Sequence, residues 1–447
     1  MKSLAARTAL LPFSRSAVLG AVDAVREVEI RNDTGALSDN LLHQIRQDGD
    51  DRWLFVAHGT EPYNKDVSRR QGVRITLTGN WTPTLYDTTT GEIKPMPYKT
   101  ANGKTIIETA LYDYDSLLLK LSPAAEGASY AAPVAEKVTA KPIAVPNALP
   151  YTLSEPNVLV LDMAEFALDD DADYAPAEEL LRADNVCRKR LGWPLRGGRI
   201  TQPWCIEPEP IEHQIRLRFT FRSTIPLRNA LLALEDAEDA KIILDGATVP
   251  SVVVGWYVDK SIKKVALPPI EAGEHKLEVI LPFGRRTNVE WCYLLGDFGV
   301  SLRGTEATVI APADKLAFGN ILPQGLPFYG GEVTYCLDFI SNGGKVSLRV
   351  PHYKAAVLSV AVDGEKVATL AYPPYKLDLG RLSAGSHKLE ITAYISRQNA
   401  FGPLHLSDMR VTWIGPSAWR STGDSWTYAY NLYPEGITSA VELTEEE

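Results

Sequence analysis

Short segments with alternating apolar and polar side chains run through the first quarter of the chain. Residues 72–79 (GVRITLTG) alternate with a period of two, and residues 52–58 (RWLFVAH) form a mostly apolar run. Residues 105–108 and 116–121 have the same character, and turn residues separate the segments. Strands at this spacing are typical of an antiparallel sandwich. The pattern therefore predicts an N-terminal β-sandwich domain over residues 1–121.

One pattern occurs twice in the second half of the chain. An Asp-Gly pair at 245–246 precedes AGEHKLEV at 272–279, and another at 363–364 precedes AGSHKLEI at 384–391. The histidines of the two copies lie 387 − 275 = 112 residues apart, which is about the length of one domain. Asp-Gly and Ala-Gly pairs between alternating segments indicate hairpins or loops. We expect two tandem jelly-roll sandwiches, in which the repeated histidines have a structural role.

The segments between these β regions have a different character. Residues 122–150 hold five prolines and nine alanines, a composition that indicates an extended linker. Residues 176–191 carry apolar side chains at spacings of three and four, with acidic residues first and basic residues last, which predicts a helix. Domain boundaries follow: a first jelly roll with its preceding strand and helix at 151–303, and a second at 304–440. The acidic tail, 442–447, is expected to fray.

Composition restricts the class of ligand. The formal net charge is −10, which disfavours nucleic acid and an anionic membrane surface as partners. No apolar stretch is long enough for a membrane span, and the first 22 residues lack a clean signal sequence, so we expect a cytoplasmic protein unless an upstream segment is missing. A neutral ligand such as a sugar is compatible with this charge.

Motifs for known chemistry are missing from the sequence. There is no phosphate-binding loop, nucleophile elbow or cysteine–histidine constellation, and no cofactor is implied. Glu290 and Asp297 are the best local candidates for a glycosidase acid, but neither has a counterpart in the second repeat. No catalytic residue is therefore assigned. The acidic run at 169–173 leaves calcium open beside a solvated loop, because Tyr174 stands where an EF-hand needs glycine.

Aromatic side chains in two loops of the first repeat suggest a sugar site. One loop spans 256–259 and the other 285–291, and each combines aromatic rings with charged or amide side chains. A flat ring can pack against the apolar face of a pyranose while the polar groups bind its hydroxyls. For Trp256 and Trp291, a place in the sandwich core stays equally open. The candidate carbohydrate-binding residues are Trp256, Tyr257, Asp259, Arg285, Asn288 and Trp291.

The run LLHQIRQDGDDRWLFVA at 41–57 resembles the stretch that follows the catalytic barrel in large bacterial rhamnosidase-like, family-2-related glycoside hydrolases. The repeated Asp-Gly and Ala-Gly-x-His-Lys-Leu-Glu signals, over 195–303 and 304–438, resemble the galactose-binding-like domains of those enzymes. The resemblance covers nearly the whole chain. It implies a mainly β fold, a sandwich followed by two galactose-binding-like jelly rolls with one clear helix. The barrel that carries the catalytic acids in that family has no counterpart here, so no catalytic residue is transferred.

Three functions stay open on the sequence. The first is an accessory, carbohydrate-associated module of a glycoside hydrolase system, whose partner would be a carbohydrate or a catalytic domain or subunit. The second is a small glycoside hydrolase with a site between modules. The third is a structural or adhesive protein that binds other proteins. Two carboxylates facing one cleft at about 5–10 Å would favour the second, and a large apolar patch the third.

Overall fold

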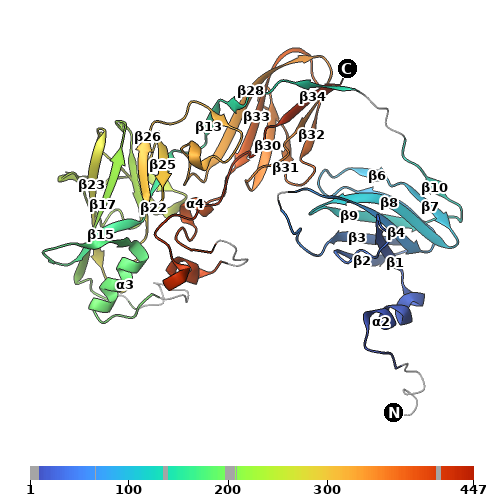
Figure 1. Ribbon diagram of the computed structural model, residues 1–447, viewed down its shortest axis with the longest axis horizontal. Helices are drawn as coiled ribbons and strands as arrows, with labels where there is room; N and C mark the ends of the chain where they lie inside the picture. Colours follow the sequence, from blue (N-terminus) through green and yellow to red (C-terminus); the bar gives the residue numbers. More distant parts are fainter. Residues whose placement is uncertain are drawn as a thin grey trace. The chain divides into compact units, whose positions relative to one another are not determined.

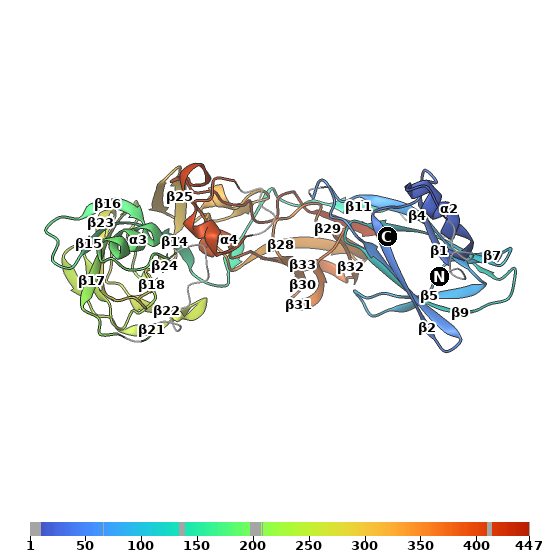
Figure 2. The ribbon, with the colours of Figure 1, turned by 90° about the horizontal axis from the view of Figure 1, so that it is seen from below.

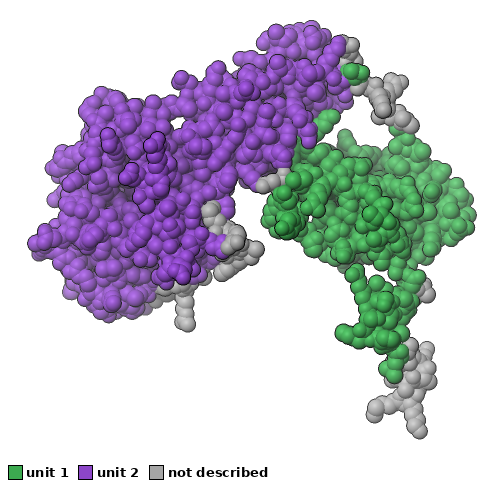
Figure 3. Space-filling model, in the orientation of Figure 1, with its two compact units in different colours: residues 1–139, 372–376 green, residues 140–371, 377–447 purple. Residues whose placement is uncertain are grey.

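The computed structural model describes residues 10–65, 67–133, 139–196, 207, 209–408 and 414–446. Strands make up 49% of the structure and helices 8%, so the protein is mainly β, as the alternating pattern predicts. The chain divides into two compact units, Met1–Thr139 with Tyr372–Lys376 and Ala140–Ala371 with Leu377–Glu447 (Figure 3). No helix within the described ranges is long and apolar enough to cross a membrane.

Unit 1 is a β-sandwich whose two sheets enclose one core. One sheet has the order β1 (Val28–Asn32), β4 (Arg70–Thr78), β8 (Lys104–Tyr112), β7 (Tyr98–Ala101), β10 (Ser129–Tyr130). The other has the order β2 (Leu41–Asp48), β3 (Asp51–His58), β9 (Ser116–Pro123), β5 (Trp81–Tyr86), β6 (Ile93–Pro95). Leu54 of β3 and Ile75 of β4 are fully buried in the same cluster, because alternate side chains of each strand face inward. A short helix, α2 (Arg15–Val22), and a 3₁₀ turn, η1 (Asp23–Val25), precede the sandwich.

The first repeat, in unit 2, consists of two sheets and a helix (Figure 1). One sheet has the order β14 (Asn157–Leu161), β24 (Cys292–Gly296), β18 (Leu231–Leu234), β22 (Asp259–Ala266), β21 (Val253–Tyr257). The other has the order β16 (Ala175–Glu179), β15 (Met163–Leu168), β17 (His213–Ser223), β23 (Gly273–Phe283), β19 (Lys241–Leu244), β20 (Ala247–Val249), and β26 (Glu306–Ile310) joins β17 to β25 (Gly299–Arg303).

The second repeat uses the same strand order as the first. One of its sheets has the order β13 (Tyr151–Leu153), β28 (Glu332–Asn342), β33 (Ala384–Tyr394), β30 (Val357–Val362), β31 (Glu365–Leu370). The other has the order β11 (Ala140–Ile143), β34 (Glu442–Glu446), β29 (Lys345–Arg349), β32 (Lys376–Arg381). The long central pairs correspond, β17 with β23 and β28 with β33, and each joins eleven residues of both strands. The shared order is what the repeated sequence pattern predicts.

In the sequence, the first repeat is inserted between strands that belong to the second repeat. Strand β11 pairs with β34, near the end of the chain, and Figure 2 shows β11 beside that end. Strand β13 pairs with β28, and β12 (Ala148–Leu149) pairs with β27 (Leu316–Ala317). The range 122–150, which the composition marks as a linker, therefore contains strands that complete the second repeat. The sequence pattern misses them because the partners of these short strands lie far away in the sequence.

The helix of the first repeat is shorter than its pattern predicts. α3 spans Leu180–Arg190, whereas residues 175–179 form strand β16 along β15. Proline at position 176 is tolerated because β16 lies at the edge of its sheet. The Glu179 carboxylate caps the helix by accepting the backbone N–H of Arg182 at 3.1 Å. Cys187, on the apolar face of this helix, lies in the core, where burial raises the pKa of its thiol to about 11.

Residues 442–446 of the acidic tail do not fray, and residue 447 lies outside the described ranges. Glu442–Glu446 is an inner strand, in which Leu443 and Glu445 face inward. The Glu445 carboxylate accepts bonds from the Ser341 hydroxyl and from the backbone N–H groups of Asn342 and Gly344. The Ser341 bond leads the effects that lower its pKa to about 2. The prediction fails because it took charge alone as a sign of a free end.

A C-terminal segment crosses from the second repeat to the first. It contains α4 (Gln398–Phe401), η4 (Pro416–Arg420) and η5 (Gly423–Ser425), and another 3₁₀ turn, η3 (Leu322–Gln324), lies between the repeats. Leu404 is buried in the core cluster of the first repeat, and Phe401 and Tyr430 pack against it. The two repeats therefore share a packed boundary within unit 2.

Candidate functional site

The loops that carry the predicted sugar-binding residues lie at the same end of the first repeat. Strand pairing places Leu234 opposite Lys263 and Ala233 opposite Tyr293, so β18 ends where β22 and β24 begin. In the facing sheet, His213 at the start of β17 pairs with Phe283 at the end of β23. The connections 235–240 and 284–291 pass between the sheets at this end. We call it the loop end; it also includes the β21–β22 turn at residue 258.

Neighbouring aromatic residues of β21 take opposite directions. Trp256 is 50% exposed, whereas Tyr257 is buried, with its ring centroid 5.4 Å from that of Tyr293. Strand alternation separates the two rings, so Tyr257 lies in the core rather than at the surface. Asp259 holds its own turn, because its carboxylate accepts the backbone N–H of Ser261 at 2.8 Å and the hydroxyl at 2.6 Å.

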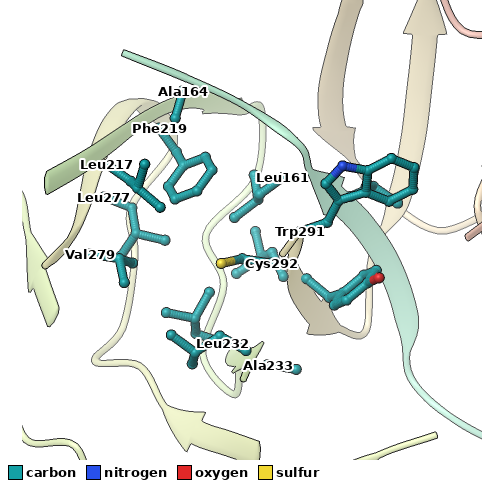
Figure 4. Close-up of a cluster of buried hydrophobic side chains, with 14 of the residues drawn as sticks. Leu161, Ala164, Leu217, Phe219, Leu232, Ala233, Leu277, Val279, Trp291 and Cys292 are labelled. Carbon is teal, nitrogen blue, oxygen red and sulfur yellow. The ribbon is translucent and has the colours of Figure 1, made fainter. Parts of the chain in front are cut away.

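The second predicted loop is also divided between surface and core. Arg285 is exposed and lies 3.4 Å from Glu209 in an ion pair. Trp291 is buried, and its indole N–H donates to the Glu179 carboxylate at 2.7 Å. Figure 4 shows the Cys292 sulfur directed into the leucine cluster, and the Trp291 ring on the other side. The equal choice that the sequence leaves for Trp291 is thus resolved as a core position, because its N–H has a buried acceptor.

A groove of about 620 Å³ opens at the loop end. Trp193 lines it beside Arg285, Arg286 and Thr287, and Asp236 comes from the other connection. The Trp193 ring keeps partial exposure and has its centroid 5.4 Å from that of Phe283. Among the six predicted residues, Arg285 is the one that lines this groove. No local sequence pattern marks Trp193, because the other residues of the groove come from three later segments, 207–213, 236–239 and 282–287.

Asn288 belongs to a cluster of charged groups near the groove. Its side-chain oxygen accepts a bond from Arg196, and its amide lies 3.5 Å from the Glu235 carboxylate. Burial raises the pKa of Glu235, although the Asn288 bond opposes the change. The buried Nε atoms of Arg196 and Arg420 have no hydrogen-bond partner within the described ranges, and Arg196 Nε lies 3.6 Å from an Asp184 carboxylate oxygen in an ion pair. Buried polar atoms without a hydrogen bond are uncommon in proteins.

Glu290 is the most strongly perturbed carboxyl group of this cluster. It keeps some accessible surface, yet protein atoms surround its carboxyl group, and this burial raises its pKa to about 7. The nearby Glu235 raises it further, and Arg420 and Arg196 oppose the change. No hydrogen bond to its carboxylate joins it to another described residue. A carboxyl group with such a pKa is half protonated near neutral pH.

A second buried cluster joins the first repeat to the C-terminal segment. Asp162 accepts bonds from His405 at 2.8 Å and from the Tyr430 hydroxyl at 2.6 Å. The other ring nitrogen of His405 donates to the Thr427 carbonyl at 2.9 Å. Burial alone would lower the pKa of His405, but the bond to Asp162 leaves it raised. Asp162 and His405 are 1% and 2% exposed, so this cluster is closed to a ligand.

The repeated histidines have the same surroundings in both repeats. His275 donates to Asp245 at 2.7 Å and to the Glu271 carbonyl at 2.8 Å, and His387 donates to Asp363 at 2.6 Å and to the Ser383 carbonyl at 2.9 Å. Each aspartate lies in the left-handed region, with φ of 49° and 52°. Both histidines therefore fix a turn.

The remaining acidic candidates have protein contacts or lie elsewhere. In the run at 169–173, Asp169 bonds His213 at 2.8 Å, and Asp171 pairs with Arg190 at 2.7 Å. The Arg190 bond holds the pKa of Asp171 at about 2. Asp297 is exposed after β24, at a groove lined by residues 151–157 and 312–314, away from Glu290 at the other end of that strand.

Comparison with known proteins finds similarity among solved structures only. No family model matches the sequence, and neither does any curated protein. A rhamnosidase from Novosphingobium sp. PP1Y is 14% identical with a TM-score of 0.43, over 96% of this chain and 26% of that one. A GH2 β-galacturonidase from Eisenbergiella tayi is 14% identical with a TM-score of 0.21, over 54% and 37%. An α-L-rhamnosidase from Streptomyces avermitilis is 12% identical with a TM-score of 0.20, over 93% and 35%.

These structural neighbours are glycoside hydrolases. The chain spans about a quarter of the length of the Novosphingobium rhamnosidase that it matches.

Proposed function

We propose that the chain is an accessory, carbohydrate-associated module of a glycoside hydrolase system, and that the loop end of its first repeat binds a neutral sugar. The groove beside Trp193 carries this proposal. A partly exposed indole gives an apolar surface for one face of a sugar ring, and Arg285, Arg286 and Asp236 supply donors and acceptors for hydroxyl groups.

The size and charge of the groove fit such a ligand. Its volume of about 620 Å³ lies within the range of about 300–1,000 Å³ that small-molecule sites occupy. Acidic residues outnumber the two arginines on its walls, which disfavours a polyanion. The acidic residues that line it are Glu207, Glu209, Glu212, Asp236 and Asp239.

Binding of neutral oligosaccharides, measured on a glycan array and then by calorimetry, tests this proposal. Arg285→Gln should weaken binding about threefold to tenfold, because one charged hydrogen bond is worth about 1.5 kcal/mol or less at an open site. Arg285 is exposed, so the melting temperature should not change. Trp193→Ala should abolish binding, and Trp193→Phe should restore part of it.

Arg303→Gln is a matched control, because Arg303 is exposed in β25 and does not line the groove. The proposal is wrong if neutral sugars bind equally to the wild type, to Arg285→Gln and to Trp193→Phe, or if no neutral sugar binds at all.

A small glycoside hydrolase is the second candidate, and Glu290 is the observation that favours it. A pKa of about 7 suits a general acid at neutral pH, and Glu235 is a carboxyl group near it. We expect no turnover of aryl glycosides above background, because no groove described at the loop end includes Glu290 among its walls. Turnover that Glu290→Gln removes and Asp297→Asn retains would establish the hydrolase instead.

A further inference from the structure

We propose that a groove between the two repeats binds a protonated amino sugar, such as a unit of a glucosamine oligomer. The groove has a volume of about 600 Å³ and lies beside β13 and β14, which are edge strands of the second and the first repeat. We call it the boundary groove; its walls are residues 151–157, 296–298 and 312–314. It goes beyond the neutral-sugar groove, because the two grooves share no residue. It rests on the proposed function only for the carbohydrate class of its ligand.

The walls of the boundary groove carry carboxylates and no basic side chain. Asp297 follows β24, and Asp314 lies in the loop between β26 and β27, so two different parts of the chain supply them. Both are exposed, and neither forms an ion pair with another described residue. The third carboxylate, Glu155, is already held by Arg397, with 2.8 Å between Nη2 and Oε2. Two carboxylates are therefore available to a cation.

Asn157 adds a buried acceptor that lacks a partner. It is 2% exposed at the start of β14, and it lines the groove. Its amide nitrogen donates to the Phe298 carbonyl at 2.7 Å and to the Gly325 carbonyl at 2.9 Å. Its side-chain oxygen has no hydrogen-bond partner among the residues that the structure describes. Since buried polar atoms are nearly always paired, this oxygen indicates that a donor group belongs at the floor of the groove.

An organic cation suits the groove better than a metal ion does. A metal ion needs several ligands around one point, and the described residues contain no group of three His, Cys, Asp or Glu side chains placed to hold one. Carboxylates from separate segments fit a cation that is itself extended. Apolar side chains share the walls with them, namely Leu153, Pro156 and Pro312. A ligand with both an apolar face and a positive charge would match this lining.

A tyrosine ring beside a carboxylate supplies the two contacts that an amino sugar needs. Tyr151 keeps partial exposure on the wall of the groove. Burial raises the pKa of its hydroxyl, and the nearby charge of Asp314 raises it further, so the two groups are neighbours. A pyranose can pack its apolar face on the ring while its ammonium group pairs with the carboxylate. A linear polyamine would use the carboxylates alone.

Calorimetry with glucosamine oligomers in mildly acidic solution tests the proposal, and the fully N-acetylated oligomers are the matched ligands without charge. The wild type should bind the amine form more tightly than the acetylated form, and added salt should weaken this preference. Asp297→Asn with Asp314→Asn should lower the affinity for the amine form about threefold to tenfold, because exposed ion pairs are individually weak. Both residues are exposed, so the melting temperature should not change.

Asp338→Asn with Glu365→Gln is the matched control, because both residues are exposed in the second repeat and lie outside the groove. It removes the same two charges and should bind like the wild type. Equal losses in the two double variants would overturn the proposal, because the attraction would then come from the net charge of −10. Equal affinity for the amine and acetylated forms would also overturn it. So would spermine, a polyamine without a sugar ring, if it bound as tightly and depended equally on Asp297 and Asp314.

The two carbohydrate proposals fail separately. Arg285→Gln should weaken neutral-sugar binding and leave the preference for the amine form unchanged, which would support both sites. If neutral sugars bind and the amine form is not preferred, the boundary-groove proposal alone is wrong. If glucosamine oligomers bind through Asp297 and Asp314 and no neutral sugar binds, the neutral-sugar proposal alone is wrong.

Discussion

The smallest unit that both repeats keep is an aspartate–histidine pair. The aspartate begins a turn in the left-handed region, and its second oxygen accepts the backbone N–H of the residue after the histidine, Lys276 or Lys388, at 2.8 Å. Each histidine ring bonds the aspartate with one nitrogen and a backbone carbonyl with the other, and so ties the turn to the following strand. Repetition in the sequence was a sound guide to this structural role, because a catalytic histidine has no reason to occur in both copies.

The pair at the second repeat should make stability depend on pH. The Asp363 bond raises the pKa of His387 above 6.5. The stabilisation of the folded state by His387 is therefore complete below about pH 6.5, and it disappears as pH rises through the pKa of His387 in the folded protein. The His387 bond lowers the pKa of Asp363, so that contribution disappears as pH falls below about 3.8. His387→Gln should therefore lower the urea midpoint more at pH 5.5 than at pH 9.

Urea unfolding at the two pH values checks this prediction, with Asp363→Asn as the partner variant. The double variant should lose no more than the larger single loss, because the two residues stabilise one turn. A His387→Gln effect of the same size at both pH values would contradict the raised pKa of His387.

At the scale of elements, the local sequence pattern predicts which face of a helix is buried better than it predicts where a helix or strand begins and ends. The spacing of Leu180, Ala183 and Cys187 identified the buried face of α3, and all three are buried. The pattern does not predict where α3 begins, because pairing of β16 with β15 competes with helix formation at 175–179, and this pairing depends on contacts outside the segment. The final strand was missed for a related reason: Glu445 is charged, and its partners at 341–344 lie about 100 residues away.

The final strand gives a test at this scale. Leu443 is 1% exposed between the sheets of the second repeat, so Leu443→Ala should cost about 2–5 kcal/mol of unfolding free energy. Glu442→Gln, one residue earlier and exposed, should change it by about 0.5 kcal/mol or less. Chemical unfolding followed by tryptophan fluorescence measures both. Equal, negligible effects would mean that the tail frays.

For the whole molecule, the sequence revealed the duplication but not the nesting of the repeats. The Asp-Gly and Ala-Gly signals are local, and they identified two copies. Strands such as Ala140–Ile143 are short and contain proline, so no periodicity marks them, and their partner lies about 300 residues away. The candidate site shows the same limit: of the two loops expected to form it, 285–291 contributes to the groove and 256–259 does not, and Trp193 comes from outside both.

The stability of unit 2 should be greatest in mildly acidic solution. Burial raises the pKa values of Glu179, Glu290 and Glu435 to about 7, so folding favours their protonated forms, and this stability is lost as pH rises from about 4.5 through 7. The raised pKa of His405 acts in the same direction. Asp171 and Glu445, with pKa values of about 2, remove stability as pH falls below about 4.

The melting temperature should therefore pass through a maximum between about pH 4.5 and 6, and fall by roughly 5 °C or more by pH 8.5. Differential scanning calorimetry across this range measures it. Glu179→Gln should flatten the alkaline side of the curve, because the amide cannot ionise. A melting temperature that rises steadily from pH 5 to 8.5 would contradict the raised pKa values.

Nesting also determines how the protein would carry a mechanical load. Strand β11 enters unit 2 beside the point where β34 leaves it, since Ala140 pairs with Glu446. Tension between residue 139 and the end of β34 would pull these paired ends apart, and the hydrogen bonds between β11 and β34 would break one after another from that end. The first repeat lies between these two strands along the chain, so it would bear no force until β11 and β34 had separated.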